Sequence, residues 1–101
     1  MIILYPIELV VQRGGSDTIT KLYLMNRKDH WLAEKETDKV IVHFGKDSFS
    51  NPTDGEWHTY HSFNGANTIS PYLNQHFPLG AVLQFAVVED KDGYLHFLHV
   101  V

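Results

Sequence analysis

Apolar residues occur in short runs separated by clusters of turn-forming residues, a pattern that predicts several short β-strands. The first run, residues 2–12, is rich in Ile, Leu and Val and ends at the turn signal of residues 13–17. Pro6 interrupts this run, and because proline donates no ladder hydrogen bond, we expect a sheet edge or a bulge there. A second strand is expected over residues 18–25, which become apolar on both faces toward their end.

The middle of the chain predicts a hairpin and one further strand. Residues 31–35 and 39–44 flank a short polar stretch, so the turn is expected at residues 36–38. In the second arm of this hairpin, one face is expected to carry Val40, Val42 and Phe44. Residues 56–63 are expected to form one strand inside a long stretch that has almost no aliphatic residues.

Residues 80–89 and 94–101 form the clearest hairpin of the sequence. A two-residue type I′ turn at residues 92–93 would place Glu89 directly opposite His96. We therefore expect these two side chains to form a stabilising cross-strand pair rather than a functional site.

One short helix is expected near residues 70–77, because Ser70 suits the N-cap and Pro71 suits the first helical position. Its apolar stripe would consist of Ile69, Leu73 and Phe77, and Pro78 would end it. The elements together predict a mainly β (β-rich α+β) fold. It has about six mostly antiparallel strands in a small barrel, roll or sandwich, with this one helix.

The composition indicates an ordinary globular protein. The chain has 101 residues, 44% hydrophobic and 20% charged, which predicts a single domain over residues 1–101. The apolar N-terminal run is short and lacks a basic region, so neither a signal peptide nor a membrane span is expected. An edge strand near Pro6 would be compatible with a dimer, but nothing in the sequence determines the oligomeric state.

The charge and the lack of cysteine exclude several classes of function. Eight Lys and Arg residues against twelve Asp and Glu residues give a formal charge of −4, and the basic residues are scattered. Nucleic-acid binding is therefore disfavoured, because it requires clustered cations. The absence of cysteine excludes disulfides and thiolate chemistry and agrees with a cytoplasmic location.

The stretch GEWHTYHSFNG contains the residue types that bind metals or transfer protons. His58 and His61, helped by Glu56, would be the catalytic residues if the protein were an enzyme. A metal, if one is bound, would use His58, His61 and His43. However, His58 and His61 face opposite sides of a strand, and the usual metal-binding motifs are missing. We therefore expect no metal and no cofactor.

The same region is rich in aromatic and short polar residues, a composition that suits recognition. The expected binding residues are Phe49, Trp57, Tyr60, Phe63 and Asn64. The alternative is that Trp57 and Phe63 close the open end of a barrel.

These observations favour a small non-enzymatic binding module over an enzyme. Its partner is expected to be a protein, as for an inhibitor or immunity protein of bacterial or phage character, contacted through residues 45–65 and the exposed end of the 89–93 hairpin. One alternative is a small hydrolase or nuclease that uses His58 and His61. The other alternative is a β-barrel that binds nucleic acid or oligosaccharide.

Overall fold

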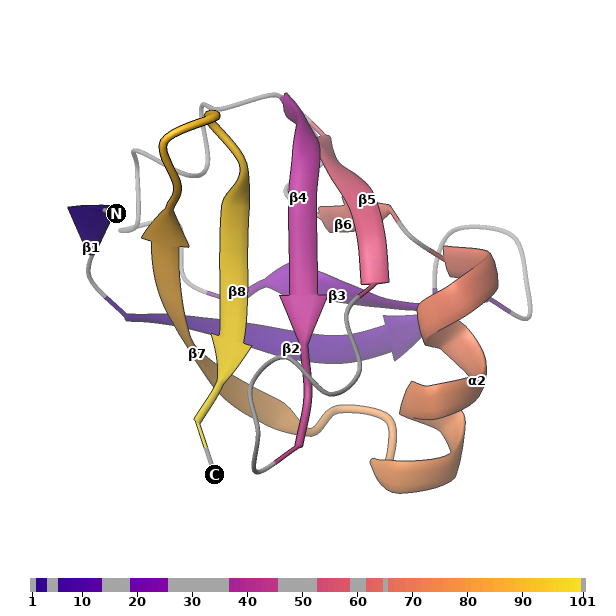
Figure 1. Cartoon of the computed structure of the whole chain (residues 1–101). Helices are drawn as coiled ribbons and strands as arrows, with labels where there is room; N and C mark the ends of the chain where they lie inside the picture. Colours follow the sequence, from indigo (N-terminus) through magenta and orange to yellow (C-terminus); the bar gives the residue numbers. More distant parts are fainter. Residues whose placement is uncertain are drawn as a thin grey trace.

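The fold is mainly β, with one mixed sheet curled into a barrel-like shape and one short helix (Figure 1). The computed structural model describes residues 2–3, 6–13, 19–25, 37–45, 53–58, 62–64 and 66–100. These residues confirm the predicted fold class.

Six of the described strands are five or more residues long. They are β2 (Ile7–Arg13), β3 (Thr20–Leu24), β4 (Thr37–His43), β5 (Thr53–His58), β7 (Val82–Glu89) and β8 (Leu95–His99). Two shorter strands, β1 (Ile2–Ile3) and β6 (Ser62–Asn64), complete the sheet. The helix is α2 (Ala66–His76).

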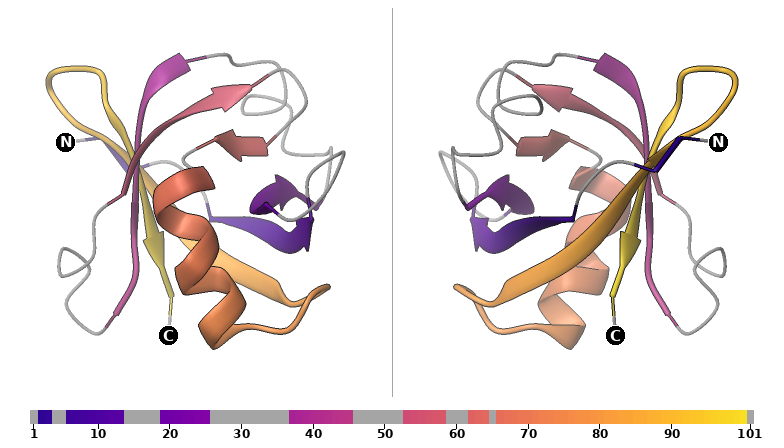
Figure 2. Two further views of the ribbon diagram at one scale, coloured as in Figure 1. Left: turned by 90° about the vertical axis from the view of Figure 1, so that its right-hand side faces the viewer. Right: turned by 90° about the vertical axis from the view of Figure 1, so that its left-hand side faces the viewer.

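The strand pairings run around the sheet and return to their starting strand. β7 pairs with β2, and the order continues through β3, β6, β5, β4 and β8, which pairs with β7 again. All these pairs are antiparallel except β4 with β8. In the left view of Figure 2, α2 lies in front of the curled sheet, between β2 and β8.

The core fills the inner face of the curled sheet, as the alternating pattern predicts. In β2 the buried residues are Ile7, Leu9 and Val11, and in β4 they are Val40 and Val42. Burying one such side chain contributes roughly 1.5–3 kcal/mol. The predicted inward face of residues 39–44 is therefore confirmed, including Phe44 at 2% exposure.

Pro6 separates two strands that pair with the same neighbour. Ile3 lies opposite Val88 and Ile7 opposite Phe85, so the N-terminal segment has one residue more than β7 between these two pairs. That extra residue is the mark of a β-bulge. The bulge expected at Pro6 is confirmed.

The helix begins earlier than the sequence predicts. It starts at Ala66, so Pro71 lies inside it and Ser70 is not its N-cap. The Ser70 hydroxyl instead accepts a hydrogen bond of 3.0 Å from the backbone N–H of Thr20 on β3. The predicted stripe is confirmed, because Ile69 and Leu73 lie in the core and Phe77 packs against it.

The β7–β8 hairpin has a longer loop than the predicted two-residue turn. Gly93 has a φ of +89° and donates its N–H to the carbonyl of Asp90 (3.1 Å), as in a type I turn followed by a left-handed residue. This loop shifts the register by one residue, so that His96 lies opposite Val88. The predicted Glu89–His96 pair is wrong.

Two further predictions are corrected by the strand bounds. Residues 56–63 do not form one strand, because β5 and β6 are separate antiparallel strands in which Trp57 lies opposite Phe63. Thr37 and Asp38 belong to β4 rather than to a turn, with a register shift between Thr37 and Val40. The other predicted arm, residues 31–35, lies outside the described residues.

Candidate functional site

The turn between β7 and β8 is organised by the side chain of Asp90. Its Oδ1 accepts hydrogen bonds from the backbone N–H of Asp92 (2.9 Å) and of Tyr94 (3.0 Å). The backbone N–H of Asp90 also donates to the carbonyl of Tyr94 (2.9 Å). Because one carboxylate oxygen is held by two backbone donors, the other oxygen has a fixed direction.

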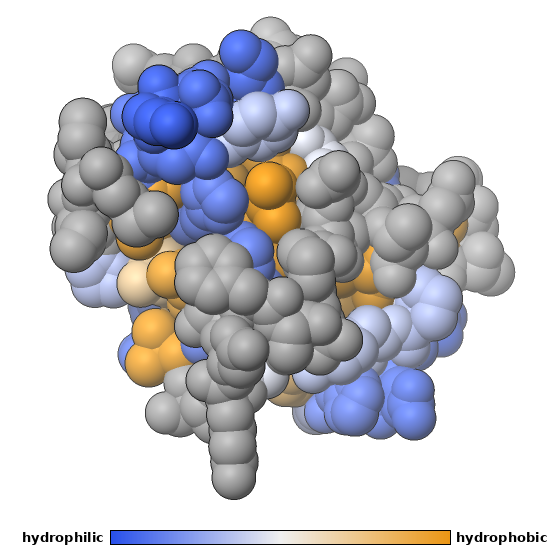
Figure 3. Space-filling model, viewed as in Figure 1, coloured by the Kyte–Doolittle hydropathy of each residue, from blue (hydrophilic) through white to orange (hydrophobic). Residues whose placement is uncertain are grey.

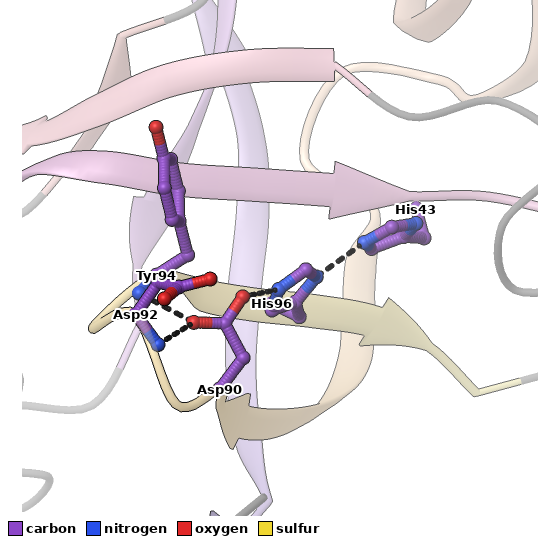
Figure 4. Close-up of polar contacts among 5 residues, drawn as sticks. All are labelled: His43, Asp90, Asp92, Tyr94 and His96. Atoms are coloured by element: carbon purple, nitrogen blue, oxygen red, sulfur yellow. Dashed lines mark hydrogen bonds and ion pairs between the residues drawn. The ribbon is translucent and has the colours of Figure 1, made fainter.

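That second oxygen contacts His96 on β8. The distance from Oδ2 of Asp90 to Nε2 of His96 is 2.8 Å (Figure 4). An ionised carboxylate has no proton to donate, so Nε2 of His96 must carry the hydrogen of this bond. Asp90 therefore sets both the position of the ring and its protonation at Nε2.

The opposite nitrogen of the same ring reaches His43 on β4. Nδ1 of His96 lies 2.9 Å from Nε2 of His43, and the two rings are nearly parallel, with centroids 5.2 Å apart. The parallel register explains the contact: Ile41 lies opposite His96, and His43 is the next residue on the same face of β4. The Asp90–His96–His43 chain thus joins the turn to two strands.

Exposure falls along this chain. The side chain of Asp90 is 23% exposed and that of His96 is 12% exposed, whereas His43 is 2% exposed. The chain therefore runs from the hydrophilic surface over the β7–β8 turn, visible at the top of Figure 3, to a buried ring.

Hydrogen bonding governs the electrostatics of Asp90. The bond from His96 is the main factor that lowers the pKa of Asp90, and the backbone donors of Tyr94 and Asp92 lower it further. Partial desolvation of the carboxyl acts in the opposite direction but is outweighed. Asp90 is consequently a carboxylate at neutral pH.

His99, at the other end of β8, lies in a different environment. Its ring contacts those of Phe44, Phe77 and Phe85, with centroids 5.3, 5.8 and 5.4 Å away. Burial among these rings lowers the pKa of His99. We interpret His99 as a packing residue that favours the neutral form.

Two of the predicted binding residues lie in the core. Trp57 and Phe63 are each 0% exposed, and the Trp57 ring meets Phe97 edge to face at 5.8 Å. Their burial agrees with the alternative role, in which they fill the barrel-like sheet. Neither side chain is available as a contact surface.

Only some of the other predicted site residues lie among the described residues. Glu56 lies opposite Asn64, and His58 lies opposite Ser62, in the β5–β6 ladder. Phe49, Tyr60 and His61 lie outside the described residues.

The proposed metal ligands do not come together as a set. Val42 lies opposite Thr53 and Thr37 opposite Trp57, so His43 and His58 are at opposite ends of the β4–β5 ladder, roughly 20 Å apart at the usual rise per residue. Among the described residues, no group of three or more His, Asp or Glu side chains is arranged to hold a metal ion. A shared site for His43 and His58 is therefore wrong.

Sequence reasoning missed both Asp90 and its link to His43. A usable signal was present, since Asp90-Lys91-Asp92-Gly93 has aspartate at the first and glycine at the fourth position, as type I turns prefer. A type I turn assigned to residues 90–93 would have given the observed strand register. The contact with His43 had no such signal, because it depends on a parallel pairing of distant strands.

Comparisons of the chain with protein-family models, with curated proteins and with solved structures gave no match. The described part of the chain contains no helix that is long and apolar enough to cross a membrane.

Proposed function

We propose that this protein is a small binding module of the inhibitor or immunity type, which acts in the cytoplasm on a protein partner. The absence of cysteine, the small size and the formal charge of −4 support this proposal. The acidic character favours a partner with a basic surface, because complementary charge accelerates and orients association.

The observation that carries the proposal is the tip of the β7–β8 hairpin. Tyr94 is 39% exposed, and Lys91 and Asp92 beside it are exposed as well. The ring of Tyr94 points away from the Asp90–His96 contact (Figure 4). Exposed tyrosine next to charged side chains is typical of recognition surfaces, where it adds contact area at low entropy cost.

The hydrogen bonds of Asp90 support the same role. They fix the turn before any partner binds, so less conformational freedom is lost on association. Phe49 and Tyr60 remain proposed contact residues, whereas Trp57 and Phe63 are left out of the proposal because each is 0% exposed.

The proposal is tested by affinity capture of a partner, followed by calorimetric titration of the purified pair. Tyr94→Ala should weaken binding at least tenfold if the tyrosine is a central contact. Leu79→Ala is the matched control, because Leu79 is 52% exposed on a different turn. Binding that survives Tyr94→Ala unchanged would refute the hairpin tip as the contact surface.

Salt provides a second criterion for the same pair. An association steered by the acidic turn should slow as the ionic strength rises, with the change mainly in the association rate. An association rate that is independent of salt would contradict the basic partner surface.

A further inference from the structure

We propose that the Asp90–His96–His43 chain is an acid-sensitive switch. It accepts one proton with its hydrogen bonds intact, and the rings of His43 and His96 separate when a second proton binds. This inference does not depend on the proposed binding function. It rests on the two contacts of 2.8 and 2.9 Å and on the donor and acceptor capacity of imidazole.

With both rings neutral, each bond of the chain has one hydrogen. Nε2 of His96 donates to Asp90, which leaves Nδ1 of His96 as an acceptor. Nε2 of His43 must then donate to that nitrogen. Both neutral tautomers are therefore fixed by the single negative charge of Asp90.

One added proton changes the direction of the second bond but does not remove it. If His96 becomes an imidazolium, its Nδ1 donates and Nε2 of His43 accepts, with the His43 hydrogen now on Nδ1. If the proton stays on His43 instead, Nε2 of that ring still donates to His96. In both arrangements the positive charge is balanced by Asp90.

A second proton cannot be accommodated in this geometry. Both facing nitrogens would carry hydrogens, so the 2.9 Å contact would bring two donors of two cations together. His43 is 2% exposed, which limits compensation by water. The rings must therefore separate for the second proton to bind, and the cost of this separation moves the second step to a markedly lower pH.

The Asp90 carboxylate contacts His96, and the strand register determines which other groups face the pair. His96 faces the apolar Val88 across β7, and β1 contributes only Ile2 and Ile3. On β7, Glu89 lies opposite Leu95 and so occupies the other face of the sheet. The remaining titratable groups near the pair are Lys39 on β4, Asp54 opposite Ile41 on β5, and Lys91, Asp92 and Tyr94 at the turn.

Separation of the two rings would affect the contact between β4 and β8. β4 and β8 form the parallel pair, and His43 and His96 tie their outer faces together. Separation of the rings would loosen this pair and release His96 from its position beside the turn. The expected response to acid is therefore local, centred on β4, β8 and the β7–β8 turn.

The test is an NMR titration that follows the ring nitrogens of His43 and His96 in the intact protein. We expect His96 to carry its hydrogen on Nε2 at high pH. We also expect two separate protonation steps for the pair, at least about one pH unit apart, as for strongly interacting sites. A single step in which both rings take up protons independently at the same pH would overturn the proposal.

Two variants separate the coupling from the properties of each ring. In His43→Leu, the second step should disappear, and the protonation midpoint of His96 should change because its Nδ1 has lost its partner. In His96→Gln, His43 should titrate in one step. An unchanged His96 midpoint in His43→Leu would refute the coupling, and the wild-type titration decides the matter if either variant does not fold.

Discussion

Nε2 of His96 lies 2.8 Å from Oδ2 of Asp90, a residue that sits in the adjoining turn rather than on the facing strand. The contact is a consequence of loop length. Because the loop comprises residues 91–93, Val88 takes the position opposite His96, and the Asp90 carboxylate is free to turn back toward the ring. The same carboxylate binds two backbone N–H groups, so one residue fixes both the turn and the histidine.

Asp90→Asn should destabilise the protein at neutral pH, because asparagine can still accept the backbone hydrogen bonds but has no charge for His96. The folded-state pKa of Asp90 is lowered from 3.8, so its contribution to stability is fully present above that value. It is lost as the pH falls through the lowered pKa. Urea unfolding near pH 7 and near about pH 2.5 measures the difference between variant and wild type, which should shrink at the lower pH.

Asp92→Asn is the matched control for this prediction, since Asp92 is exposed on the same turn. It removes the same formal charge but leaves the Asp90–His96 contact in place. If Asp92→Asn lowered the stability as much as Asp90→Asn, the general charge of the turn, and not the contact with His96, would be responsible.

His99 should make the fold sensitive to mild acid. Its folded-state pKa is lowered from 6.5 by burial, so the unfolded chain binds a proton more readily than the folded one. The stability contributed by neutral His99 is therefore present above about pH 6.5 and lost as the pH falls toward the lowered pKa. His99→Phe should reduce this loss, as measured by thermal unfolding between about pH 7.5 and about pH 5.

The control for His99 is His76→Gln, because His76 is exposed on α2. This variant should keep the acid sensitivity of the wild type. An acid response that is identical in His99→Phe and wild type would assign the effect to other groups.

Much of the fold could be predicted from the sequence, because the alternation of apolar residues is a local property. The inward faces of β2 and β4, the bulge at Pro6 and the Ile69–Leu73 stripe of α2 all follow from residue spacing. Each of these features depends on side chains that are close together in the sequence.

The errors arose where distant parts of the chain decide the local structure. Ser70 resembles an N-cap, but its hydroxyl is used by Thr20, fifty residues earlier. Trp57 and Phe63 belong to a region of polar composition, yet antiparallel pairing places them opposite each other in the core. The His43–His96 contact likewise requires the parallel pairing of β4 with β8, which no local sequence pattern predicts.

Trp57→Ala should cost about 3–5 kcal/mol of stability, as expected for removal of a large buried aromatic side chain. Trp57 is 0% exposed and packs edge to face on Phe97. Urea unfolding measures the loss, with Trp57→Phe as a variant that should retain a large part of the stability. A loss below about 1 kcal/mol in Trp57→Ala would contradict its place in the core.

Ser70→Ala should cost about 1–3 kcal/mol, because it leaves a buried backbone donor without its acceptor. The N–H of Thr20 donates to the Ser70 hydroxyl at 3.0 Å, and Thr20 is 0% exposed. The Thr20 hydroxyl also donates to Oδ1 of Asn74 (2.5 Å), so two polar contacts attach α2 to β3. Amide hydrogen exchange should show faster exchange at Thr20 in Ser70→Ala.

The exposed helix position Gln75 provides the comparison for this last variant. Gln75→Ala should leave both the stability and the exchange rate at Thr20 close to those of the wild type, since alanine is a good helix former. If Ser70→Ala behaved like Gln75→Ala, water or a rearranged helix would have to satisfy the Thr20 donor. The attachment of α2 would then depend on its apolar face, Ile69 and Leu73, rather than on these hydrogen bonds.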